Sequence, residues 1–164
     1  MPAPTPSRPP SRPPAAEPAE TQLGDMLCFA VYSAGLAFNR LYKPLLDQLD
    51  LTYPQYLVML ALWEQDGQTV GGLGEKLYLE SSTLTPLLKR LEGNGYVRRV
   101  RNPDDERQVQ IFLTEAGRDL KLPATACPAT TLQALQRSPD ELLALKREVE
   151  TLRDTLNAFI AARS

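Results

Sequence analysis

The sequence predicts a mostly helical chain of the α+β class that contains one antiparallel hairpin. Apolar residues recur at spacings of three and four over several segments, which is the period of an amphipathic helix. Residues 96–101 and 108–113 look like two short strands instead, and residues 102–107 between them favour turns. With 164 residues, 43% of them hydrophobic, the chain is long enough for one domain with extensions.

The first fifty residues divide at about position 22. Residues 1–22 are rich in proline and nearly without large apolar side chains, so we expect a disordered tail. Residues 23–50 carry one apolar face at helical spacing. Pro44 is expected to kink this helix or to split it near Tyr42.

Three further helices are predicted before the hairpin. The first spans about 52–66, with Thr52 or Tyr53 near its cap, and a short second helix spans about 70–79. The third is expected to end at Gly93-Asn94-Gly95. Its cap candidates are Ser81, Ser82 and Thr83. Its predicted buried face is Leu84, Leu87, Leu88 and Leu91.

After the hairpin, Thr114 begins another helix, whose course Pro123 and Pro128 interrupt. The last helix begins at Ser138-Pro139-Asp140-Glu141, which has the pattern of a capping box with proline in the first turn. Its apolar residues step by 3 and 4 and form a narrow seam that requires a partner helix: Leu142, Leu145, Val149, Leu152, Leu156 and Phe159.

Composition excludes several classes of protein. The chain has no histidine and two cysteines, which removes nucleophile–histidine pairs and four-cysteine zinc sites. We therefore expect no enzyme, no metal and no cofactor. No apolar run reaches 18 residues and the first residues lack the pattern of a signal peptide, so we expect no membrane span and a cytoplasmic protein.

The net charge of −2 hides a basic segment at residues 81–101, which carries five basic side chains against Glu92 alone. Three helices followed by a hairpin are the element order of a winged helix-turn-helix. In that motif the second helix of the helix-turn-helix, the recognition helix, enters the major groove of DNA, and the wing approaches the minor groove. The alternative is a solvated basic face on an ordinary helical domain. The residues predicted to contact DNA are Ser81, Ser82, Thr83, Thr85, Pro86, Lys89, Arg90, Arg101, Asp105 and Arg107.

Cys28 lies near the start of the first long helix. A free cysteine is often only a small buried apolar residue. Phenol hydroxyls that donate to a thiolate favour its charged form, and Tyr32, Tyr42 and Tyr53 are candidates for such donors. The alternative for these tyrosines is core packing. Cys127 is either an incidental surface thiol or a resolving cysteine.

The segments LYLESSTLTPLLKRLEGNGYVRR and NPDDERQVQIFLTEAG resemble the recognition helix and wing of MarR-type winged-helix regulators, and within them the OhrR group of organic hydroperoxide sensors. The resemblance covers about Leu27 to Gly117. It implies a homodimer joined through its first and last helices, which binds a palindromic operator in double-stranded DNA and represses transcription. The chain then divides into a tail at 1–22, dimerisation regions at 23–50 and 118–164, and a DNA-binding domain at 51–117.

The same resemblance implies that Cys28 is the peroxide-reactive thiol, that Tyr42 and Tyr53 hydrogen-bond to it, and that Cys127 forms a disulfide with it in the two-cysteine class. Whether that bond is within or between subunits stays open. Three alternatives also stay open: a regulator released by a small phenolic or other ligand with idle cysteines, a thiol peroxidase, and a winged helix that contacts only proteins.

Overall fold

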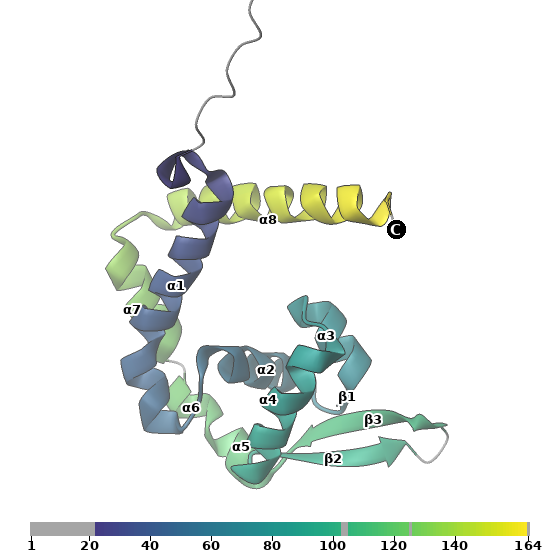
Figure 1. The fold of residues 1–164 in the computed structure, drawn as a ribbon. Helices are drawn as coiled ribbons and strands as arrows, with labels where there is room; N and C mark the ends of the chain where they lie inside the picture. Colours follow the sequence, from purple (N-terminus) through teal and green to yellow (C-terminus); the bar gives the residue numbers. More distant parts are fainter. Residues whose placement is uncertain (1–21, 103–104, 125, 164) are drawn as a thin grey trace, which may run out of the picture. The chain divides into compact units, whose positions relative to one another are not determined.

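The computed structural model describes residues 22–102, 105–124 and 126–163, apart from the side chains of residues 102, 105–107 and 126–128. The chain forms two compact units, Met1–Leu36 and Ala37–Ser164. The tail predicted at residues 1–22 falls outside the described residues except for Gln22. Figure 1 labels the helices and strands in chain order.

The described part of the first unit is helical. A 3-10 turn, η1 (Leu23–Asp25), precedes helix α1 (Leu27–Leu46), which continues into the second unit. The prediction that Pro44 would split this helix near Tyr42 is wrong. Pro44 is the third residue from the end of α1, so its missing N–H removes a hydrogen bond only in the last turn.

Side-chain caps begin two of the first helices of the second unit, and the cap of α2 lies where the sequence predicts it. After the 3-10 turn η2 (Asp47–Leu49), helix α2 (Tyr53–Glu64) starts with a capping box between Thr52 and Gln55, and the Thr52 N–H donates to Gln55 Oε1 at 2.8 Å. Helix α3 (Val70–Leu77) is capped by Thr69, and helix α4 is Ser81–Gly93.

The core of the second unit lies between these helices and the sheet. The buried leucines of α4 meet α2, α3 and the inner residues of the strands. Burial of each such side chain contributes roughly 1.5–3 kcal/mol. The buried apolar residues are Leu46, Leu51, Tyr56, Val58, Met59, Ala61, Leu62, Leu73, Leu84, Leu88, Leu91, Val97, Ile111, Leu113 and Ala124.

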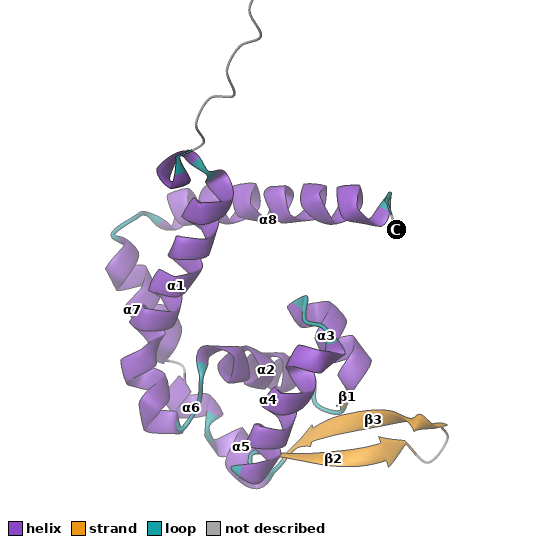
Figure 2. Cartoon of the chain, in the orientation of Figure 1, coloured by secondary structure: helices purple, strands orange, loops and turns teal. Residues whose placement is uncertain are grey.

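The sheet contains the predicted hairpin and one strand that was not predicted. Strands β2 (Val97–Asn102) and β3 (Asp105–Leu113) pair antiparallel and form the hairpin drawn in orange in Figure 2. The expected turn at 102–107 is too long, because β3 already begins at Asp105. Strand β1 (Gln68–Thr69) pairs with β3, so the strand order is β1-β3-β2.

Four helices follow the hairpin: α5 (Glu115–Asp119), α6 (Lys121–Ala124), α7 (Ala126–Leu135) and α8 (Pro139–Ala161). Pro123 and Pro128 are each the third residue of a short helix, where a missing N–H is tolerated, and Cys127 is the second residue of α7. Ser138 and Glu141 form the predicted capping box of α8. Within the described ranges, no helix is both long enough and apolar enough to cross a membrane.

Candidate DNA interface and thiol site

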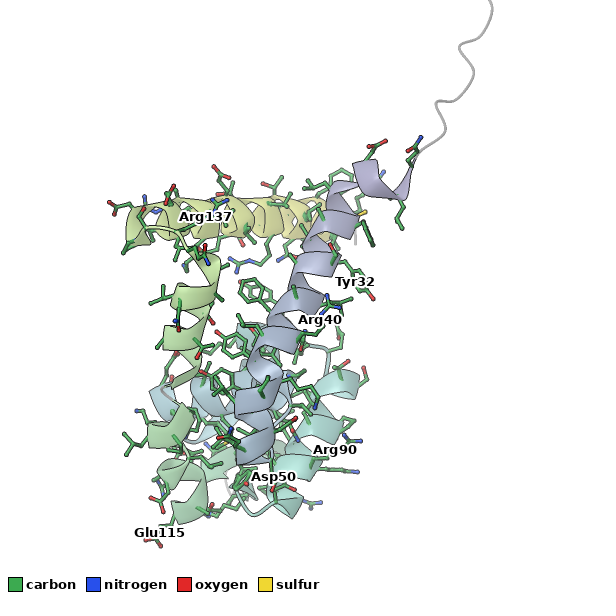
Figure 3. The ribbon with its side chains drawn as sticks, turned by 90° about the vertical axis from the view of Figure 1, so that its left-hand side faces the viewer. Tyr32, Arg40, Asp50, Arg90, Glu115 and Arg137 are labelled. Carbon is green, nitrogen blue, oxygen red and sulfur yellow. The ribbon has the colours of Figure 1, made fainter. Side chains whose placement is uncertain are left out.

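Helix α4 turns a hydroxyl-rich and basic face to solvent because three leucines anchor its opposite face. Leu84, Leu88 and Leu91 are fully buried, and Arg90 projects away from the helix in Figure 3. Of the predicted contacts on α4, Thr85 is half-buried, and the exposed ones are Ser81, Ser82, Thr83, Pro86, Lys89 and Arg90. The expected hydroxyl cap is wrong: the cap residue is Glu80, without a side-chain bond, so these hydroxyls do not cap the helix.

A close backbone approach fixes the turn between α3 and α4. A Cβ on Gly74 would lie 2.8 Å from the Leu79 carbonyl oxygen, closer than real Cβ atoms come. Leu79 N–H donates to the Gly74 carbonyl at 2.9 Å, and Tyr78 takes the left-handed conformation with φ 55°. Glycine at position 74 therefore allows α4 to follow α3 as the second helix of a helix-turn-helix.

The wing carries further basic residues at its base. The Arg98 guanidinium lies 4.9 Å from the centre of the Phe112 ring, and the Arg99 N–H donates to Glu92 Oε1 at 3.2 Å, which ties α4 to β2. Arg101 is exposed on β2. The side chains of Asp105 and Arg107, predicted at the wing tip, lie outside the described residues.

Cys28 is the second residue of α1, in the first unit, and its thiol is free and exposed. Tyr32, one turn further along the same helix, is also exposed. The Cys127 side chain lies outside the described residues. Among the residues that the structure does describe, no group of three or more Cys, Asp or Glu side chains could hold a metal ion.

The second unit brings Tyr42 and Tyr53 together, with the ring centres 5.1 Å apart. Tyr56, which was not predicted, completes the cluster at 5.9 Å from Tyr42; its position three residues after Tyr53 on α2 was the available signal. Burial raises the pKa of Tyr53, and the nearby Tyr42 raises it further, so Tyr53 keeps its proton and stays a hydrogen-bond donor. Thr131 Oγ1 donates to the Tyr42 hydroxyl oxygen at 2.6 Å.

Both units expose apolar side chains from long helices. In the first unit these include Leu27, Val31 and Leu36 of α1. On α8, most of the predicted seam stays exposed within this chain: Leu145 by 41%, Val149 by 49%, Leu156 by 53% and Phe159 by 60%. Such faces are unusual on a monomer and mark interaction surfaces.

Residues 40–122, about half of the chain, match the model of the SarA/Rot transcriptional regulators. The chain belongs to this family. Two relatives agree with the assignment. The HTH-type transcriptional regulator TtmR of Methylorubrum extorquens is 52% identical over 83% of this chain and 70% of its own length. The organic hydroperoxide resistance transcriptional regulator of Bacillus subtilis is 47% identical over 83% of this chain and 92% of its own length.

A similar protein of known structure, AbfR of Staphylococcus epidermidis, has been solved reduced on DNA, overoxidized on DNA and with a disulfide formed. Reduced AbfR bound to DNA is 38% identical, covers 84% of this chain and 95% of AbfR, and has a TM-score of 0.71. AbfR with a disulfide formed covers 84% of this chain and 92% of its own, with a TM-score of 0.55.

These findings test the predicted fold class, family and general function. The fold class, a mostly helical winged helix-turn-helix, is confirmed, and so is the resemblance to the OhrR group. The protein is a transcriptional regulator homologous to an organic hydroperoxide resistance regulator, and not an enzyme, so the thiol peroxidase alternative is removed. The roles of the individual site residues remain predictions.

Proposed function

We propose that this regulator is a cytoplasmic, redox-sensing repressor, which binds a palindromic operator as a homodimer and dissociates when an organic hydroperoxide oxidises Cys28. The observation that carries the proposal is the free, exposed thiol of Cys28 near the start of α1, in a chain 47% identical to an organic hydroperoxide resistance regulator. In this scheme residues 51–117 read DNA, and residues 23–50 and 118–164 form the dimer.

The dimer is argued from the uncovered apolar side chains. The seam of α8 repeats at steps of three and four, which is the pattern of a helix that packs against another helix, yet Val149 is exposed by 49% and Phe159 by 60%. Leu27 and Val31 of α1 are exposed as well. A second copy of the chain offers a matching set of apolar residues through two-fold symmetry.

DNA binding is argued from the exposed face of α4 and the base of the wing. Arginine can form two hydrogen bonds with one guanine, so Arg90 is the proposed base-reading residue, whereas Lys89 and the hydroxyls of Ser81, Ser82 and Thr83 suit phosphates. A dimer places two such helices in successive major grooves, which explains the palindrome. Arg101, Asp105 and Arg107 are the proposed contacts of the wing.

The chemistry begins with the Cys28 thiolate. Its sulfur attacks the terminal oxygen of the hydroperoxide, and an S–O bond forms as the O–O bond breaks, which converts Cys28 to a sulfenic acid. The alkoxide that leaves takes a proton from solvent and becomes the alcohol. The proposed donors to the thiolate are Tyr42, Tyr53 and Tyr32. Hydrogen bonds to the charged form of a thiol favour that form and so the reaction.

Cys127 then resolves the sulfenic acid. The Cys127 thiolate attacks the Cys28 sulfur, an S–S bond forms as the S–O bond breaks, and the leaving hydroxide takes a proton from solvent and becomes water. The disulfide requires the two sulfur atoms to come within about 2 Å of each other. In a dimer with separated cysteines this requirement moves helices and changes the spacing of the two α4 helices. AbfR, which has been solved both reduced on DNA and with a disulfide, is consistent with such a switch.

The test is a gel shift on a palindromic duplex selected from a random pool by the reduced protein, with and without cumene hydroperoxide. Wild type is expected to release the duplex on oxidation and to bind again after dithiothreitol. Cys28→Ser should stay bound throughout, and Cys127→Ser should form the sulfenic acid without the reversible disulfide. Release of the Cys28→Ser protein by peroxide would refute the proposal.

One observation favours a second candidate, a repressor released by a small apolar or phenolic ligand. A groove of about 340 Å³ lies within the second unit between Phe38, α7 and α8. Its lining includes Leu135, Leu142, Leu145 and Lys146. Release by such a ligand would survive Cys28→Ser, so the same gel shift distinguishes the two candidates.

A further inference from the structure

An exposed aromatic side chain occupies the turn between α3 and α4. Tyr78 is exposed by 61%, although it is a large aromatic residue. Its backbone holds the left-handed conformation, with φ 55°, which is unfavourable for a residue that has a Cβ. Glycine or asparagine is usual at such a helix end. A tyrosine that accepts this strain is expected to contribute through its side chain.

The ring of Tyr78 is covered by an arginine from the last helix. The Arg153 guanidinium lies 4.7 Å from the centre of the ring, within the range of a cation–π contact. One edge of the same guanidinium is bound to Asp154, whose Oδ1 accepts from Arg153 Nε at 2.8 Å. A planar guanidinium can be bound at its edge while its face covers a ring. The contact therefore joins α8 to the turn of the helix-turn-helix.

The face of α8 that reaches this turn is not its apolar seam. Arg153 follows the seam residue Leu152, and Asn157 follows the seam residue Leu156. Each of the two polar residues lies about 100° around the helix from its apolar neighbour. Asn157 and Tyr78 line one cleft of about 450 Å³. The seam of α8 can therefore pack against a second copy of the chain while the neighbouring face contacts the helix-turn-helix.

We propose that the contact between Arg153 and Tyr78 sets the separation of the two α4 helices in the dimer, so that Arg153 determines which half-site spacing the protein prefers. The inference rests on the proposed function, because it requires a dimer through α8 and a palindromic operator. One base pair more or less between the half-sites moves them by about 3.4 Å along the duplex and rotates them by about 35°. A helix-turn-helix that is tied to α8 must break the tie to fit such a duplex.

The alternative role for this contact is to stabilise the folded subunit and nothing else. A loss of stability lowers the fraction of folded protein and weakens binding to every duplex by the same factor. A loss of the tie changes the ratio of affinities between duplexes, because the misfit of the wrong spacings costs less. The ratio is therefore the measurement that separates the two roles.

The experiment measures dissociation constants of the reduced full chain by fluorescence anisotropy. The duplexes are the selected palindrome and versions with the half-sites one or two base pairs closer together or further apart. Arg153→Gln is expected to lower the preference for the selected spacing about fivefold, because an exposed cation–π contact is lost from both subunits. Tyr78→Leu should lower it by the same factor. Tyr78→Phe keeps the ring and should keep the preference.

A double mutant tests whether the two residues act through one contact. Arg153→Gln combined with Tyr78→Leu should lower the preference no further than either change alone. Arg163→Gln is the matched control, because its guanidinium lies 4.7 Å from the centre of the Phe159 ring, a contact of the same kind at the end of α8. This control should keep the wild-type preference. Tyr78→Leu carries the test if the Arg153→Gln protein does not fold.

An Arg153→Gln protein with the wild-type spacing preference overturns the inference, whether or not it binds all duplexes more weakly. A Tyr78→Phe protein as relaxed as Tyr78→Leu overturns it too, because the effect then belongs to the hydroxyl. These outcomes leave the proposed function standing if wild type binds the palindrome and releases it on oxidation. A reduced wild-type protein that selects no palindrome removes both.

Discussion

Gly117 is expected to be the least replaceable glycine in the second unit. It lies in α5, directly against the main chain of Tyr96 at the start of the wing. A Cβ added at position 117 would overlap the Tyr96 carbonyl oxygen and lie 2.9 Å from its carbon, and real Cβ atoms essentially never come within 3.0 Å of such atoms. The carbonyl oxygen and carbon of Tyr96 cannot rotate away, because both atoms belong to the backbone.

The magnitude of Gly117→Ala follows from the bonds that meet there. The Tyr96 carbonyl accepts from the Thr114 N–H at 3.0 Å, and the Gly117 carbonyl accepts from Trp63 Nε1 at 2.8 Å. Overpacking costs about 1–3 kcal/mol and one strained or lost buried hydrogen bond about 1–3 kcal/mol. Against this, alanine is more favourable than glycine in a helix by about 1 kcal/mol of folding free energy. The expected net loss is about 3 kcal/mol, or about 10 °C in Tm.

Urea and thermal unfolding at one fixed protein concentration measure this loss, because the stability of the proposed dimer would depend on concentration. The matched control is Gly71→Ala in α3, where an added Cβ meets nothing within 4 Å. The control is expected to be neutral or stabilised by up to about 1 kcal/mol. A Gly117→Ala protein as stable as wild type would refute the packing argument.

Three further predictions concern the proposed surfaces and the last helix. Lys89→Ala should weaken binding to all duplexes alike and reduce the slope of log K against log salt concentration by about one. Arg90→Ala should cost about 1–3 kcal/mol of binding free energy and relax sequence specificity. Titrations at several salt concentrations would show both effects, and equal losses of specificity in the two variants would contradict this division of roles. Val149→Asp should remove about 3 kcal/mol of apolar burial from each proposed dimer, so it should raise the dimer dissociation constant at least about 100-fold. Sedimentation measures this constant, and Ala144→Asp, a change outside the seam, should leave it unchanged. Hydrogen bonds from Ser138 lower the pKa of Glu141, so their stabilisation is present above the ordinary glutamate pKa and is lost as pH falls through the lowered value. Ser138→Ala removes only the side-chain hydrogen bond and keeps the larger one from the Ser138 N–H, so it should flatten the acid limb of a stability–pH curve in part, whereas Glu141→Gln should remove the contribution of this carboxylate. An acid limb that Glu141→Gln leaves unchanged would contradict the coupling.

The sequence by itself determined the elements that depend on neighbours three or four positions away. The cap near Thr52, the capping box at Ser138, the buried leucines of α4 and the hairpin were predictable, because caps and amphipathic periods are local properties. The basic, hydroxyl-rich face of α4 followed from the same period. Family resemblance, and not periodicity, supplied the expected roles of Cys28 and Cys127.

Tertiary structure alone decided the contacts between distant segments. The two-residue strand β1 exists because β3 lies beside it, and Asp66 accepts from the Leu113 N–H at 2.7 Å across 47 positions. Likewise, Thr131 meets Tyr42, and Gly117 meets Tyr96, only after the chain has folded. A residue's partners at such separations depend on how whole helices and strands pack, which no local pattern of side chains encodes.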